Sequence, residues 1–185
     1  MSARREPESA GLLVIVRRDH REIERMLTEV DARSGAARKR AVEELFRKLA
    51  VHETAEQEIV HPLARHAGAG AIADELVQDE ALVADRLEVF EGSKVDSARF
   101  AKAFDELARV IRFHARREEM DEHPPIEANV SWFALETFGR AFCAADAVAP
   151  VAGDPPTSAR APALSVAPVR AVADLARETI RGAMQ

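Results

Sequence analysis

Residues 52–62 read HETAEQEIVHP, and residues 114–124, which lie 62 positions later, read HARREEMDEHP. Both segments follow the pattern H-x-x-x-E-x-x-x-x-H-P. A second correspondence, at an offset of 60, relates Asp19-His20 to Asp79-Glu80, and each pair is followed by a leucine seven positions on. The 185-residue chain therefore contains two similar units of about 60 residues, each predicted to be a helical hairpin.

The placement of proline and the abundance of helix-forming residues predict an all-α fold. Ala, Leu, Glu and Arg are frequent, β-branched runs are few, and no proline interrupts the long central stretches. The helices are expected at about residues 10–31, 36–61, 71–91, 96–122 and 128–147. Short connections favour antiparallel neighbours, so the first four form an up-down-up-down four-helix bundle to which the fifth is added.

The C-terminal composition predicts an extension to the bundle. We expect residues 1–148 to hold the bundle with its fifth helix. Trp132 and Phe133 would pack this helix against the bundle, and the alternative for the pair is a patch that binds a partner. Residues 149–168 are rich in Pro and Ala and are interpreted as a linker, followed by a short helix within 169–185. The proline content indicates a flexible connection.

Composition excludes several classes of protein. The chain has 26 Lys and Arg against 32 Asp and Glu, a net charge of −6, whereas nucleic-acid-binding domains are normally basic. Cys143 is the single cysteine, so an internal disulfide or a multi-cysteine metal site is excluded, and it is interpreted as a small buried apolar residue. The apolar run at 11–16 is too short for a signal peptide or a membrane span. We therefore expect a cytoplasmic protein with no nucleic-acid or membrane partner; a protein partner stays unknown.

Polar residues interrupt the apolar stripes of the four main helices. Each stripe repeats at alternating steps of three and four residues, which is typical of the inward face of a bundle. The interrupting residues are three histidines and three glutamates, and we expect all of them in the core: His20, His52, Glu56, Glu80, His114 and Glu118.

These six side chains predict a metal site. A buried carboxylate destabilises the fold by several kcal/mol unless it is paired or metal-bound, and the stripes carry no inward Lys or Arg. The His-x-x-x-Glu spacing puts both side chains on one helix face, one turn apart. Oxygen and nitrogen ligands without thiolate favour iron or manganese over structural zinc. Bridging carboxylates allow two ions, with positions left for oxo, hydroxo or solvent ligands. The alternative is a buried His–Glu hydrogen-bond network without metal.

Residues 11–147 resemble the hemerythrin-like family, the HHE cation-binding domains. The resemblance depends on Asp19-His20 and on the two H-x-x-x-E segments that end near proline. It implies a four-helix bundle with a non-haem di-iron centre, which binds or senses oxygen, nitric oxide, peroxide or iron itself.

Glu80 departs from the family pattern, because family members usually have a histidine at this position of the third helix. The alternative to metal ligation is that Glu80 is solvated, or only orients a ligand through a hydrogen bond. As a metal ligand, this carboxylate should stabilise ferric iron and lower the reduction potential. Reversible oxygen carriage is then less expected than peroxide, nitric-oxide or iron-handling chemistry, and whether the protein is an enzyme stays open. Two alternatives are an iron-storage or iron-sensing protein and a metal-free helical interaction module.

Five other polar residues are expected outside the ligand set. His61 and His123 lie nine residues after proposed ligands, and so on the opposite side of an ideal helix, which favours packing at the end of the bundle over ligation. Glu24, Glu53 and Glu119 are expected to be exposed, or to orient ligands through hydrogen bonds.

Overall fold

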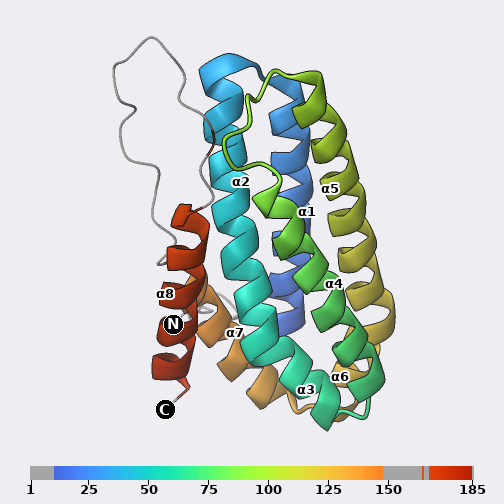
Figure 1. Ribbon diagram of the computed structural model, residues 1–185. Helices are drawn as coiled ribbons and strands as arrows, with labels where there is room; N and C mark the ends of the chain where they lie inside the picture. Colours follow the sequence, from blue (N-terminus) through green and yellow to red (C-terminus); the bar gives the residue numbers. More distant parts are fainter. Residues whose placement is uncertain (1–10, 148–163, 165–166, 185) are drawn as a thin grey trace, which may run out of the picture.

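The computed structural model describes residues 11–147, 164 and 167–184, and the described part of the chain contains helices and turns but no strand (Figure 1). The predicted all-α fold is confirmed. Of the predicted linker, residues 149–163 and 165–166 lie outside the described residues. No described helix is long and apolar enough to cross a membrane.

Four long helices lie side by side, and the chain reverses direction from each one to the next (Figure 1). They are α1 (Leu12–Ala32), α2 (Gly35–Ala55), α4 (Gly70–Glu88) and α5 (Ala98–Arg117). The connection from α1 to α2 is short because Gly35 adopts a φ of 56°, which places its N–H within 3.1 Å of the Asp96 carboxylate. The Ser97 hydroxyl accepts a hydrogen bond from the Phe100 N–H and begins α5.

Two π-helical turns carry the bundle helices past their prolines, where the sequence predicts that they end. These elements are η1 (Glu56–Val60) with α3 (His61–His66), and η2 (Glu118–Glu122) with α6 (His123–Asn129). Pro62 and Pro124 have no N–H, and a proline ring clashes with the carbonyl four residues back in a regular α-helix. The wider turn avoids this clash, and the His61 N–H bonds to the Glu56 carbonyl five residues back.

The apolar core is divided into two clusters that lie on either side of a polar layer. One cluster, away from the π turns, contains Leu27, Leu45, Phe46, Phe90 and Phe104. The other surrounds the lower ends of α1 and α2, and also includes residues of the C-terminal helices. Each cluster excludes water from its own side of the layer, so polar groups that face it need partners inside the protein.

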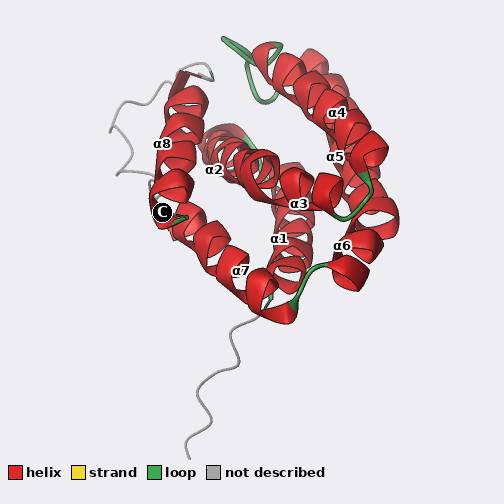
Figure 2. Ribbon diagram, turned by 90° about the horizontal axis from the view of Figure 1, so that it is seen from below, coloured by secondary structure: helices red, strands yellow, loops and turns green. Residues whose placement is uncertain are grey.

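Helices α7 (Trp132–Ala147) and α8 (Ala167–Ala183) pack on the outside of α1 and α2 (Figure 2). Val172, Ala176 and Ile180 of α8 are buried, so this helix docks on the bundle. The prediction that Trp132 and Phe133 pack the fifth helix against the bundle is wrong, because they are 67% and 71% exposed. The inward face of α7 comes later in the helix, at Ala141, Phe142 and Ala145. Cys143 is half-buried beside this cluster.

Candidate metal centre

The structure buries all six predicted ligands at one level of the bundle. Their side chains enter from α1, α2, η1, α4, α5 and η2, which brings together residues almost 100 positions apart in the chain. All six, together with Glu53, form two groups in which the potential ligand atoms lie within 4.8 Å of one another. The first group is His20, His52, Glu56 and Glu118, and the second is Glu53, Glu56, Glu80 and His114. Glu56 belongs to both groups.

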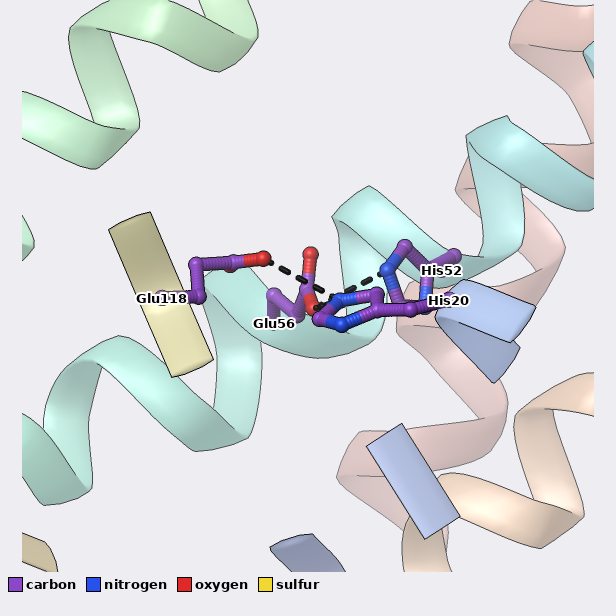
Figure 3. A group of neighbouring side chains, drawn as sticks. All are labelled: His20, His52, Glu56 and Glu118. Atoms are coloured by element: carbon purple, nitrogen blue, oxygen red, sulfur yellow. Dashed lines mark ion pairs between the residues drawn. The ribbon is translucent and has the colours of Figure 1, made fainter. Parts of the chain in front are cut away.

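The first group has two imidazoles turned toward two carboxylates (Figure 3). His52 Nε2 lies 3.0 Å from Glu56 Oε1, one helical turn later. His20 Nε2 lies 3.5 Å from the same oxygen and 3.2 Å from Glu118 Oε2. Nitrogen and oxygen atoms from three separate helical segments therefore converge on one point.

The second group is centred on His114. Its Nε2 atom lies 3.3 Å from Glu118 Oε1 and 3.9 Å from Glu53 Oε2. Glu53, expected outside the ligand set, has only 14% of its side chain exposed. The sequence signal that could have identified it is its spacing of three residues from Glu56, which puts both on one helix face.

Buried atoms without partners provide a test of whether these residues fit a metal ion. Twelve buried side-chain nitrogen and oxygen atoms have no hydrogen-bond partner among the described residues, and all belong to histidines and glutamates of this layer. Both carboxylate oxygens of Glu56 and of Glu118 are among them. Native proteins rarely leave such groups unsatisfied, and an ion is one of the few explanations. Imidazole nitrogen and carboxylate oxygen also suit iron and manganese, so the residues fit.

Residues 12–127 match the family model described as Hemerythrin HHE cation binding domain. The chain belongs to this family. This match confirms the resemblance seen in the sequence. Members of the family are helical cation-binding domains, and iron is their typical cation. No curated protein and no solved structure matches the chain.

His61 and His123 lie inside this HHE domain, fully buried beside the predicted ligands. His61 Nε2 is 2.7 Å from Glu80 Oε1, and its Nδ1 is 2.7 Å from Glu122 Oε1. The potential ligand atoms of His61, Glu118 and Glu122 form a third compact group. Neither ring nitrogen of His123 has a hydrogen-bond partner in the described part of the chain, and this ring stacks on His20 with 6.3 Å between centroids.

The π-helical turns explain why the sequence placed these two histidines on the wrong side. Nine residues at about 100° each end opposite the starting point on a regular α-helix. A π turn absorbs one extra residue, so the following side chains rotate back by roughly 100° toward the interior. The sequence signal that was missed is the proline directly after each histidine, which favours such a turn.

Further side chains hold the ring and carboxylate orientations. Glu119 Oε1 lies 2.8 Å from His20 Nδ1, in the orienting position that the sequence predicted. The Gln57 amide donates to Glu80 Oε2 over 2.5 Å. Such contacts fix the direction in which a ligand atom points and are typical around metal sites in proteins.

Lys48 is a buried cation that the stripe analysis missed, because it lies beside the stripe of α2. Its Nζ donates to Asp19 Oδ2 over 2.7 Å and to Asp146 Oδ1 over 2.6 Å. Asp19 in turn lies 3.9 Å from His52 Nδ1. Two aspartates therefore neutralise Lys48, and the central glutamates receive no compensation from it.

The buried glutamates of the two ligand groups favour any positive charge that can reach them. Burial alone would lower the pKa of His20, but the carboxylates of Glu118 and Glu56 raise it to about 11. Burial also acts against the charged form of His114, whose pKa Glu118 and other glutamates raise to about 10. Burial raises the pKa of Glu53 well above its usual range. Protons and metal ions therefore compete for the same atoms.

Proposed function

We propose that the protein binds two iron ions and that these ions bind, sense or convert oxygen, nitric oxide or peroxide. The observation that carries the proposal is the pair of ligand groups that share Glu56, whose two carboxylate oxygens are buried and have no hydrogen-bond partner among the described residues. One ion would be held by His20, His52, Glu56 and Glu118, and the other by Glu53, Glu56, Glu80 and His114. Iron held in this way supplies redox chemistry and open positions for a small ligand.

The surrounding residues support this role. Glu119 orients His20, while apolar clusters lie on either side of the layer. The carboxylate-rich set, with Glu80 in place of an imidazole, favours ferric iron and thus chemistry with peroxide or nitric oxide over reversible oxygen carriage. Manganese fits the same donor atoms.

The test is to add ferrous iron anaerobically to the full chain, remove excess, and count bound iron. Oxygen, nitric oxide and hydrogen peroxide are then added separately while absorption is recorded. The wild-type chain should bind two ions and change spectrum with at least one of the three. His52→Ala and His114→Ala should each bind one ion or none, whereas His66→Ala, a change at an exposed histidine of α3, should leave the count at two.

Two other results would replace this proposal. Iron that binds and strongly stabilises the fold, but responds to none of the three molecules, would identify an iron-storage or iron-sensing protein. A chain that binds no transition metal, and whose stability is unchanged when His20, His52 and His114 are replaced, would identify a helical interaction module.

A further inference from the structure

A cavity of about 410 Å³ lies between α1 and α5 and reaches the candidate metal centre. Its inner end is formed by His20, His52 and His114, whose rings also belong to the two ligand groups. Protein cavities of about 300–1,000 Å³ commonly hold organic molecules, whereas one water occupies only about 30 Å³ of liquid volume. The cavity is therefore far larger than oxygen, nitric oxide or peroxide requires.

One side of the cavity is apolar. Ile23 and Leu27 of α1, Leu49 of α2 and Ile111 of α5 line it, and each is buried. These residues come one or two helical turns away from the three histidines along their own helices. A hydrocarbon segment could therefore lie against them with one part close to the imidazoles, and its burial would be favourable.

The opening of the cavity is positively charged, although the chain as a whole is acidic. Arg21, Arg112 and Arg116 line it and are exposed. Arg112 donates two hydrogen bonds to the Glu24 carboxylate, of 2.7 and 2.9 Å, which connect α5 to α1. Arg21 and Arg116 have no carboxylate partner in the part of the chain that the structure describes. Two arginines are thus free to pair with an anion from solution.

We propose that this cavity binds a small organic carboxylate with an apolar body, such as a medium-chain fatty acid. The carboxylate pairs with Arg21 and Arg116 at the opening, and the chain lies on Ile23, Leu27, Leu49 and Ile111. Binding itself requires only the cavity. That the bound molecule is presented to the metal ions rests on the function proposed above.

Isothermal titration calorimetry of the full chain, with and without iron, tests this proposal with octanoate as the probe. Octanoate should bind at least tenfold more tightly than acetate, which lacks the apolar body, and than octanamide, which lacks the charge. The double variant Arg21→Gln/Arg116→Gln should weaken octanoate binding at least tenfold and leave octanamide binding unchanged. A matched control, Arg40→Gln/Arg109→Gln, removes the same charge from exposed arginines outside the cavity and should have little effect.

Ile111→Trp fills the cavity and should abolish binding of octanoate and octanamide alike, with helical content checked by circular dichroism. The proposal is overturned if octanoate binds no better than acetate, or if the two arginine double variants behave alike. Iron counted in the same samples separates the two proposals. Iron without octanoate binding overturns only the cavity ligand, whereas octanoate binding without iron overturns only the di-iron function.

Discussion

The two H-x-x-x-E-x-x-x-x-H-P segments have the same backbone course but opposite electrostatics at their final histidine. His61 has a carboxylate on each ring nitrogen, from Glu80 and Glu122. Burial alone would lower the pKa of His61, but these two carboxylates raise it to about 11. His123 has no hydrogen-bond partner among the residues that the structure describes, and burial lowers its pKa to about 4.

The difference originates in the residue that each histidine faces. His61 faces Glu80, and His123 faces His20, which is the residue corresponding to Glu80 in the repeat. The hydrogen bonds to these two residues also correspond in the repeat. The Gln57 amide donates a hydrogen bond to Glu80, and Glu119, at the position equivalent to Gln57, forms a hydrogen bond with His20. Histidine in one repeat, at residue 20, thus replaces glutamate in the other, at residue 80, and the side chain that contacts this position changes from Gln57 to Glu119. The course of the helices stays the same in both repeats.

The largest expected effect on iron binding comes from replacing Glu56, the residue that the two ligand groups share. Glu56→Ala should reduce bound iron from two ions to none, because both groups lose a ligand. Metal analysis after gel filtration gives the count. Glu178→Ala, at an exposed position of α8, is the control and should retain two ions. Full iron content in Glu56→Ala would show that the groups do not share this carboxylate.

Replacement of His61 and of His123 should change the free energy of unfolding of the iron-free protein by clearly different amounts. His61→Phe removes the ion-pair partner of both Glu80 and Glu122, which are buried, and should lower the free energy of unfolding by about 3–5 kcal/mol. His123→Phe removes two nitrogens that have no partner, so the change should be less than about 1 kcal/mol. Urea unfolding in the presence of a chelator measures both. Equal losses would contradict the assigned electrostatic difference.

Converting one repeat into the other should show which contacts are coupled. Gln57→Glu places a carboxylate against Glu80 and should destabilise the iron-free fold by about 1–3 kcal/mol. Adding Glu80→His recreates the Glu119–His20 pair and should recover most of this loss in a double-mutant cycle. Additive effects of the two substitutions would mean that residues 57 and 80 do not interact.

The smallest effect is expected at the outer contact of His20. Glu119→Gln keeps a carbonyl oxygen that can accept a hydrogen bond from Nδ1 but removes the charge. The free energy of unfolding should fall by about 0.5–1 kcal/mol, with two iron ions still bound. Thermal unfolding with iron analysis measures both, and a loss of iron would place Glu119 among the residues needed for metal binding.

The sequence predicted those features that depend on local periodicity. The stripes of apolar residues gave the four long helices, and their interruptions gave the six side chains that the structure brings together. Charge and spacing were sufficient here because every helix turns one face to the same interior.

Features that depend on a change of helical period, or on neighbours distant in the chain, could not be predicted in this way. The π turns moved His61 and His123 into the core, against a regular 3.6-residue repeat. The large apolar side chains of Trp132 and Phe133 suggested burial, but only packing decides which face of α7 meets the bundle. Lys48 lies off the stripe and is buried because Asp19 and Asp146 accept its charge.

Native mass spectrometry of the full chain, loaded anaerobically with ferrous iron, tests the central claim most directly, because it counts ions in the folded molecule. The account predicts one dominant species with two iron ions, reduced to the metal-free mass by Glu56→Ala. A wild-type chain that keeps its metal-free mass in excess iron would contradict it.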